Sequence, residues 1–439
     1  MRVNEAFVRL RKNRSRGAAT GLCSACSSHP DVLAATVRLA ARTGTTLLVE
    51  ATANQVNHRG GYTGLTPEAF AALLAGLCER NGADPSRIVL GGDHLGPYPW
   101  RGRAASDAMR EAEVVVRRFV RAGAQKIHLD ASMPLAGDPG PALPPEIAAR
   151  RAVTLCAAAE EEWRAMDDGR PRARPAYVIG TEVPAPGGEA DTTVAHGPVP
   201  TRVADFHETV DLHRRRFHEA GLDEVWERVI AVVVQPGVEF DSRTVYPYAR
   251  ENADALSHAV AEHDGLCFEC HSTDYQSSEA LRALVEDGFA ILKVGPELTF
   301  TMREALFGLA SIEEELVPEG ASRLRATVRE AMTSDPRHWK GYYREDDSLS
   351  FCLTYGYSDR MRYYWSQPPV ATAVGRLFDN LRRIEIPAQL LSQFLPHVGP
   401  ISELPPGVRT PRELLLLCIG SSLERYLAAC QPAVAEEPA

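Results

Sequence analysis

The sequence predicts an α/β fold, a (β/α)8 TIM barrel with a C-terminal helical extension. Short apolar runs recur between residues 21 and 295, and most of them stop abruptly in polar residues that can carry chemistry. Apolar runs of this length are typical of strands buried on both faces. A helical pattern follows each run, and eight such units within about 300 residues favour a barrel.

Eight predicted strands follow one another along this region. They span residues 21–26, 46–52, 87–93, 126–132, 176–182, 229–235, 266–271 and 290–295. The helical patterns between and after them cover residues 31–43, 106–122, 145–164, 201–219, 250–263, 277–286 and 300–315. A further helix opens at Thr66-Pro67, where a capping residue precedes a proline at the first helical position.

Strand–helix alternation is also compatible with a doubly wound sheet. Dinucleotide-binding sheets commonly carry a G-x-G-x-x-G turn after a strand, and no predicted strand of this chain is followed by one. The barrel is therefore the favoured fold. In a barrel the carboxyl ends of the strands form the floor of the active site, so the residues at these ends are the functional candidates.

The chain is expected to divide into a barrel over residues 1–316 and a helical extension over residues 317–439 that packs on it. Beyond residue 316 the strand pattern stops, and aromatic clusters such as RMRYYW favour packed helices over a second barrel. Two loops after predicted strands, residues 53–66 and 183–200, are unusually long. Long loops in compact domains are often lids or binding loops.

Composition excludes several classes of partner. The 439 residues carry a formal charge of −10, which argues against a basic nucleic-acid-binding face. No apolar stretch approaches the roughly 18 residues of a membrane span. The N-terminal region lacks the apolar core of a signal peptide. We therefore expect a cytoplasmic protein with reduced cysteines, no nucleic-acid or membrane partner, and a homo-oligomer as one possible state.

An acid and an imidazole stand side by side at the end of the third predicted strand, in GGDHLG. At such a strand end, one group of the Asp93-His94 pair can bind a metal ion and the other the substrate. The alternative is a capping aspartate beside a packed histidine. Asp130 and His128 share one face of the fourth strand. Asp130, nearer the strand end, is the catalytic candidate, whereas His128 is expected to be a satisfied interior group.

His271 ends the seventh strand in FECHSTDYQ and can share a divalent metal ion with His94. Neutral imidazole suits zinc and similar ions, so zinc is expected first, with manganese, nickel and cobalt as alternatives. Glu182, in GTEVP, can be a third metal ligand or a general base. A core histidine and a solvated carboxylate are the structural alternatives for these two positions.

Other polar residues complete a ring at the strand ends. Glu50 and Gln235 end the second and sixth strands, and Asn54 follows in the adjoining loop, so all three are candidates for substrate binding. Asp274 lies just beyond His271 and can orient it or act as a catalytic acid.

Phosphate groups commonly bind after the last two strands of such barrels. There this chain offers the hydroxyls of Ser272 and Thr273 and the backbone N–H of Gly295, without a glycine-rich cradle.

Two Cys-x-x-Cys pairs, at residues 23–26 and 267–270, resemble half-sites for zinc. Both fall within predicted buried strands, where residues three apart point to opposite faces. We expect these thiols to pack as small apolar side chains.

Taken together, the motifs resemble the GatZ/KbaZ family over nearly the whole chain. The resemblance rests on GLCSACSSHP, EATANQVNHRGGYTG, GGDHLGP, KIHLDASM, GTEVPAPGGEA, VVVQPGVEFD, HSTDYQ, ILKVGPELTF and SDRMRYYW. It implies a barrel related to class II aldolases. Some members of the family are described as the non-catalytic subunit of tagatose-1,6-bisphosphate aldolase, and others as 4-epimerases of ketose phosphates or related sugars.

The class II aldolase pattern can be carried over only in part. Its Asp-His pair resembles Asp93 and His94, and its last metal histidine resembles His271. Its middle metal histidine would fall near Gln235, which implies a departure from an ordinary aldolase site. Glu182 can supply the missing ligand.

Two functions follow from the resemblance. The first is a metal-dependent 4-epimerase that interconverts tagatose 6-phosphate and fructose 6-phosphate by retro-aldol cleavage and re-formation of the C3–C4 bond. A base such as Asp93 or Glu182 would remove the C4 hydroxyl proton. The second is a non-catalytic, chaperone-like subunit that stabilises a class II aldolase catalytic subunit. The ring of polar residues favours the epimerase, because buried charge without a ligand is costly.

Overall fold

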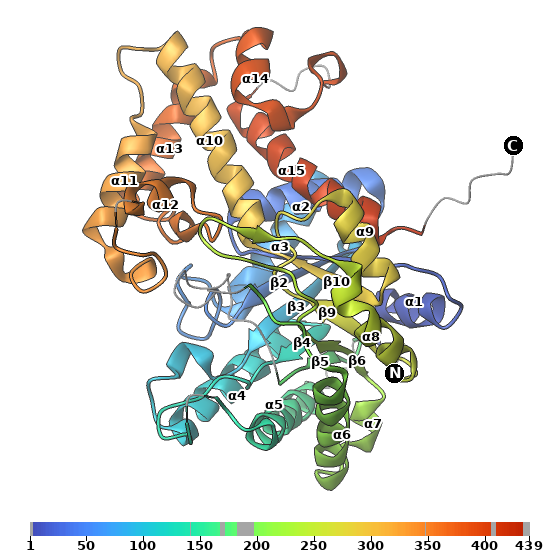
Figure 1. Cartoon of the computed structure of the whole chain (residues 1–439). Coiled ribbons are helices and arrows are strands. Elements are labelled where there is room, and N and C mark those ends of the chain that lie inside the picture. The colour runs from blue at the N-terminus through green and yellow to red at the C-terminus, as the bar shows by residue number, and fades with distance from the viewer. Residues whose placement is uncertain are drawn as a thin grey trace, which may run out of the picture.

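Eight parallel strands close into a barrel, which confirms the predicted fold class (Figure 1). The computed structural model describes residues 3–140, 142–166, 172–181, 197–346, 348–404 and 410–432. Around the barrel the strands follow the order β1-β10-β9-β6-β5-β4-β3-β2. Their bounds are β1 Leu22–Cys26, β2 Leu47–Thr52, β3 Ile88–Leu95, β4 Lys126–Leu129, β5 Ala176–Ile179, β6 Val229–Val233, β9 Cys267–Cys270 and β10 Phe289–Val294.

Helices surround the barrel, and all but one of them lie at the predicted places. They are α2 Pro30–Thr43, α3 Pro67–Asn81, α4 Ala105–Arg121, α5 Pro145–Ala165, α6 Val203–Glu219, α7 Asp223–Trp226, α8 Arg250–Ala261, α9 Ser278–Glu286 and α10 Pro296–Leu316. The short helix α7, which precedes β6, was not predicted. The predicted start of α3 is confirmed, because the side chain of Thr66 accepts a hydrogen bond from the backbone N–H of Ala69. Such a cap satisfies one of the free N–H groups of the first turn.

Two glycines of the GGDHLG motif make room for acidic residues of the neighbouring strands. Gly91 pairs with Glu50 in the sheet, and a Cβ atom at Gly91 would lie 2.6 Å from Oε1 of that glutamate. A Cβ atom at Gly96 would lie 1.6 Å from the backbone oxygen of Asp130. The motif therefore lets the strands approach closely where charged side chains fill the barrel interior.

Helix α1 (Glu5–Arg14) covers the amino-terminal end of the barrel. Its buried Phe7 and Leu10 join an apolar cluster with Val89, Ile230 and other strand residues. A short antiparallel hairpin, β7 (Glu239–Phe240) with β8 (Val245–Tyr246), follows β6 and was not predicted.

The C-terminal extension is helical, as predicted, and its last helix lies against the barrel (Figure 1). Its helices are α11 Leu324–Ser334, α12 Leu349–Tyr355, α13 Pro368–Leu381, α14 Ala388–Phe394 and α15 Pro411–Cys430. Helix α15 packs against α2, α9, α10 and strand β1. Among the described helices, none is long and apolar enough to cross a membrane.

Candidate functional site

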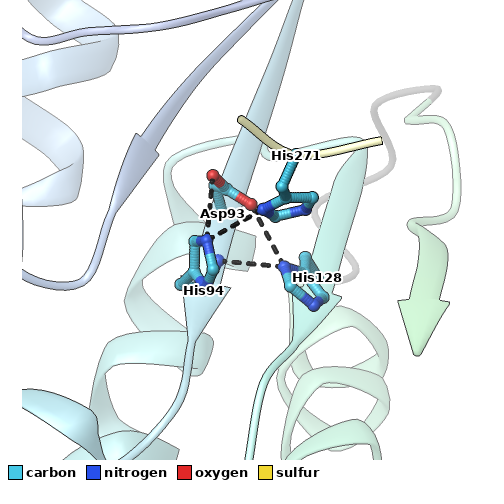
Figure 2. Close-up of side chains that lie close together, drawn as sticks. All are labelled: Asp93, His94, His128 and His271. Atoms are coloured by element: carbon cyan, nitrogen blue, oxygen red, sulfur yellow. Dashed lines mark hydrogen bonds and ion pairs between the residues drawn. The ribbon is translucent and has the colours of Figure 1, made fainter. Parts of the chain in front are cut away.

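Four side chains gather at the carboxyl end of the barrel strands. Asp93 and His94 come from β3, His128 from β4 and His271 from the residue after β9 (Figure 2). All four are buried, and one candidate ligand atom from each lies within 4.8 Å of the others. The sequence placed three of these residues at one site, and the structure brings these three together.

Carboxylates fix the orientation of two of the imidazoles. Nδ1 of His94 lies 2.7 Å from Oδ2 of Asp130, and Nε2 of His271 lies 3.0 Å from Oε1 of Glu269. An ionised carboxylate only accepts hydrogen bonds, so each of these ring nitrogens carries the proton. The opposite nitrogens, Nε2 of His94 and Nδ1 of His271, then present lone pairs to each other across 3.0 Å.

His128 departs from its expected role as a satisfied interior group. Its Nδ1 accepts a hydrogen bond from the backbone N–H of His94 at 3.3 Å and also lies 3.1 Å from Oδ1 of Asp93. Its Nε2 is buried without a partner among the described residues. One of its two ring nitrogens therefore lacks the hydrogen bond that a structural core histidine normally makes.

A divalent cation fits this cluster. Facing lone pairs repel each other unless a cation binds between them, and imidazole and carboxylate are the ligands of zinc and similar ions. The buried groups around the cluster include four carboxylates (Glu50, Asp93, Asp130 and Glu269) and two ammonium groups (Lys126 and Lys293). The carboxylates outnumber the ammonium groups, and a bound cation would reduce this excess of negative charge.

Burial and neighbouring charges shift the pKa values in the cluster. Burial alone would raise the pKa of Asp93, but the charge of Lys293, followed by those of His94 and His271, lowers it well below its usual value. Burial lowers the pKa of His271 to about 4. The pKa of His94 is raised despite burial, because Asp93 and Asp130 favour its charged form. Asp93 is therefore a carboxylate and His271 a neutral imidazole near pH 7, the forms that bind metal ions.

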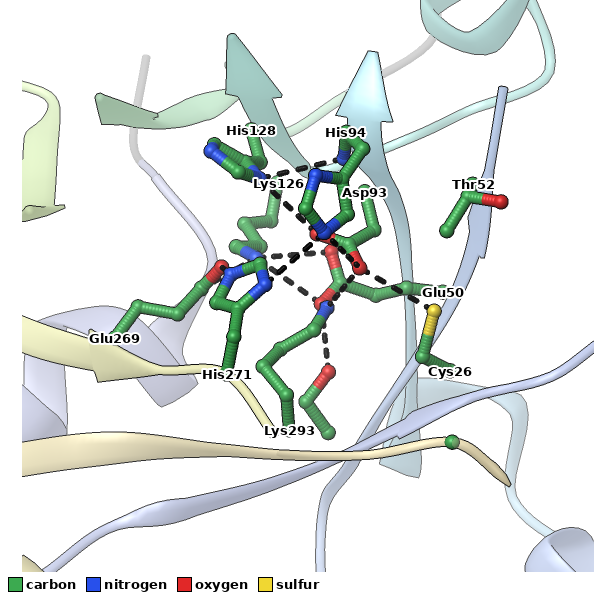
Figure 3. A network of polar contacts seen from close by, with 12 residues as sticks. Cys26, Glu50, Thr52, Asp93, His94, Lys126, His128, Glu269, His271 and Lys293 are labelled. Atoms are coloured by element: carbon green, nitrogen blue, oxygen red, sulfur yellow. Dashed lines mark hydrogen bonds and ion pairs between the residues drawn. The ribbon is translucent and has the colours of Figure 1, made fainter. Parts of the chain in front are cut away.

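A buried ion network lies next to the cluster (Figure 3). Nζ of Lys126 lies 3.0 Å from both carboxylate oxygens of Glu50 and 2.5 Å from Oε2 of Glu269. Lys293 contacts Glu50 and lies 3.1 Å from Oδ2 of Asp93. Glu50 does not line the cavity beside the cluster. It could therefore act on a bound substrate only indirectly, through the residues of this ion network.

A cavity of about 600 Å³ opens above the cluster. Of the predicted residues, those that line it are Asn54, Asp93, His94, His271, Ser272, Asp274 and Gly295. The extension contributes Arg362, Tyr363, Trp365, Ser366 and Arg412 to the same wall. The volume suits a ligand of the size of a sugar phosphate.

The donors expected to bind phosphate are engaged within the protein. The backbone N–H of Gly295 donates to Oδ1 of Asp274 at 2.9 Å, and the Thr273 hydroxyl donates to the backbone oxygen of Lys293 at 2.5 Å. The Ser272 hydroxyl donates to Glu239 at 3.1 Å. Thr273 does not line the cavity. The Asp274 carboxyl accepts hydrogen bonds from the backbone N–H groups of Gly295 and Glu297, so it is bound to the start of α10.

Two predicted residues lie elsewhere. Oε1 of Gln235 accepts from the backbone N–H of Gly237 at 2.9 Å, and the side chain does not line the cavity. Glu182 and residues 183–196 of the predicted lid lie outside the described residues.

Sequence reasoning missed Lys126, Lys293 and Glu269 as parts of the site. Each is a charged residue inside an otherwise apolar strand, in KIHL, FAILKV and CFEC. A buried charge requires a partner, so a charged residue inside an apolar strand was the sequence signal that could have identified these three. The place of Arg362 in the cavity wall was also not predicted, because the RMRYYW segment was assigned to helix packing.

Comparisons with known proteins extend over almost the whole chain. Residues 7–431 match the model of the D-tagatose-1,6-bisphosphate aldolase subunit GatZ/KbaZ-like family. A D-tagatose-1,6-bisphosphate aldolase subunit GatZ from Salmonella heidelberg is 45% identical over 424 residues, which cover 95% of this chain and 98% of that protein. The GatZ subunit from Salmonella typhimurium is 44% identical over 420 residues, covering 94% and 97% of the two chains.

Among solved structures, a bacterial protein resembles almost the whole chain. The crystal structure of a probable tagatose 6 phosphate kinase from Sinorhizobium meliloti 1021 superposes with a TM-score of 0.83 and 41% sequence identity. The match covers 93% of this chain and 100% of that chain.

Proposed function

The chain belongs to the D-tagatose-1,6-bisphosphate aldolase subunit GatZ/KbaZ-like family, and we propose that it acts as a subunit of a D-tagatose-1,6-bisphosphate aldolase. The observation that carries the proposal is the full-length similarity to GatZ subunits. Its partner would be the catalytic subunit, a class II aldolase. This role takes precedence over the epimerase that the polar ring favoured.

Co-expression with a class II tagatose-bisphosphate aldolase from the same genome tests this role. We expect the two chains to co-purify, and the aldolase to keep its activity longer at elevated temperature than when it is expressed alone. Equal half-lives with and without this chain, together with no co-purification, would contradict the proposal.

A second candidate is 4-epimerisation of a ketohexose phosphate, and the Asp93, His94, His128 and His271 cluster on the cavity wall favours it. The three imidazoles would hold a divalent ion without a contribution from Glu182, which leaves the Asp93 carboxylate beside them available as a base. When bound, such an ion would supply Lewis-acid polarisation of the ketose carbonyl.

The residues of the chain can provide the proton transfer. Asp93 is ionised, because nearby positive charge keeps its pKa low, and it can accept the proton of the C4 hydroxyl. As the C3–C4 bond breaks, C4 becomes an aldehyde and the bonding electrons pass to C3. After the aldehyde turns its other face, the bond re-forms and Asp93 returns the proton to the C4 oxygen. The buried ammonium of Lys293 holds the Asp93 carboxylate in place.

Incubation of the purified chain alone with tagatose 6-phosphate tests this candidate. Fructose 6-phosphate should form in the presence of a divalent metal ion and not in the presence of a chelator. The Asp93→Asn variant should lose the activity, whereas Asp107→Asn, an exposed position on α4, should keep it. Failure to interconvert the two sugars with zinc, manganese, nickel or cobalt would exclude the epimerase and leave the subunit role.

A further inference from the structure

We propose that Arg362, in the C-terminal extension, binds the phosphate group of the sugar phosphate that enters the cavity. The ligand class rests on the proposed function. Arg362 lines the cavity together with the metal-binding cluster, although it is about 90 residues beyond His271 in the chain. The extension would thus complete the substrate site of the barrel.

The turn that carries Arg362 is fastened to the rim of the barrel. Asp359 adopts a left-handed conformation with φ of 39°, and its Oδ2 accepts a hydrogen bond from the Thr299 hydroxyl of α10 at 2.6 Å. The hydroxyl of Tyr275, which follows β9, donates to the backbone oxygen of Tyr357 at 2.5 Å. The short helix Arg360–Tyr363 follows directly, so the position of Arg362 is set by contacts with the barrel.

The guanidinium of Arg362 has no carboxylate within ion-pair distance in the part of the chain that the structure describes. It donates to the backbone oxygens of Ser358 and Asp359 and, at 3.2 Å, to the hydroxyl of Tyr363. Neutral oxygens stabilise a half-buried cation only in part, and an anion at this position would complete its environment. Arg412, which lines the same cavity, is different, because its guanidinium lies 2.8 Å from Asp31.

Neighbouring aromatic residues support an anion at this end of the cavity. Burial would raise the pKa of Tyr363, but the charges of Arg360 and Arg362 lower it below its usual value, which indicates a positive potential. The indole N–H of Trp365 is buried without a hydrogen-bond partner among the described residues. Trp365 itself also lines the cavity.

The loops after β9 and β10 are less suited to phosphate than the sequence suggested. The donors of Ser272, Thr273 and Gly295 are already engaged, as described above. One of their acceptors is the carboxylate of Glu239, which would repel an anion. Arg362 supplies the positive charge that these loops lack.

Isothermal titration of the full-length protein with tagatose 6-phosphate and with unphosphorylated D-tagatose tests the proposal. Arg362→Gln should bind tagatose 6-phosphate at least tenfold more weakly and D-tagatose as the wild type does. Arg362→Lys should recover part of the loss, because the charge is kept and the fork geometry is not. Arg382→Gln, the control at an exposed arginine at the end of α13 that does not line the cavity, should stay within twofold of the wild type.

Wild-type affinity of Arg362→Gln for tagatose 6-phosphate would overturn the proposal, as would an equal loss of both sugars. Melting temperature and metal content report whether each variant is folded. Binding does not depend on turnover or on an aldolase partner, so the two claims can fail separately. Arg362-dependent binding by a chain that neither epimerises the sugar nor joins an aldolase would support this inference and contradict the proposed function.

Discussion

Nε2 of His94 and Nδ1 of His271 lie 3.0 Å apart, although the two residues are 177 positions apart in the chain. Each ring has its other nitrogen bonded to a carboxylate, Asp130 for His94 and Glu269 for His271. Both facing nitrogens are therefore acceptors, and only a proton or a metal ion can join them. This relationship, together with Asp93 and His128 beside it, defines the candidate metal centre.

Asp130 is expected to strengthen metal binding without being a ligand. The charge of Asp130 orients His94 and makes that imidazole a better ligand. The Asp130→Asn variant lacks this charge, so its metal affinity should fall about 10- to 100-fold. Competition with a chromophoric chelator measures this change. Asp138→Asn is the control, because Asp138 pairs with Arg151 away from the cluster and its loss should leave affinity unchanged. Unchanged affinity in Asp130→Asn would contradict the assigned role.

The buried ion network should be essential for stability. Lys126→Met leaves the carboxylates of Glu50 and Glu269 without one of their buried partners, so the free energy of unfolding should fall by about 3–5 kcal/mol. Urea denaturation measures this change. Arg42→Ala, which removes an exposed ion pair with Glu424, should cost less than about 1 kcal/mol. Equal effects of the two substitutions would show that the network contributes little.

Gly91 should tolerate no side chain. A Cβ atom at this position would meet the Glu50 carboxylate at 2.6 Å, so Gly91→Ala should lower the free energy of unfolding by about 1–3 kcal/mol. Around Gly102 a Cβ atom would meet nothing within 4 Å. Gly102→Ala should therefore change stability by less than about 0.5 kcal/mol, and a similar loss in both variants would contradict the steric argument.

Asp274 should make stability depend on pH. Burial, followed by the charge of Glu297, raises the pKa of Asp274 to about 7 from an ordinary value of 3.8. The folded state thus retains a proton that the unfolded chain releases. The stabilisation that this group gives the folded state is complete below its unfolded-state pKa. It is lost as pH rises through the folded-state pKa.

The Asp274→Asn variant should remove that loss. Between about pH 4 and pH 7 the free energy of unfolding of the wild type should fall by at least about 1 kcal/mol more than that of the variant. One pKa unit corresponds to about 1.4 kcal/mol. Parallel pH profiles for the two proteins, measured by urea denaturation, would be inconsistent with a proton on Asp274.

The sequence was sufficient for the barrel because buried parallel strands leave a strong local pattern. The eight predicted strands all occur, with ends that differ by a few residues, as at β4 and β5. The β7–β8 hairpin was not predictable, because strands of two residues have no periodicity to detect.

The site was predictable only where a residue ends a strand. Asp93, His94 and His271 met that criterion, and the structure brings them together. His128 was set aside because its partners depend on ring orientation, which no sequence pattern encodes. Arg362 reaches the cavity through tertiary contacts of the extension, and long-range packing of this kind has no local signature.

The metal content of the purified, reconstituted protein tests the central claim most directly. Elemental analysis should find one bound divalent ion per wild-type chain and per His213→Gln chain, since His213 is a buried histidine of α6 outside the cluster. The His271→Ala variant should retain almost none. Full metal content in His271→Ala, or none in the wild type after incubation with zinc, manganese, nickel or cobalt, would contradict the assignment of Asp93, His94, His128 and His271 as a metal centre.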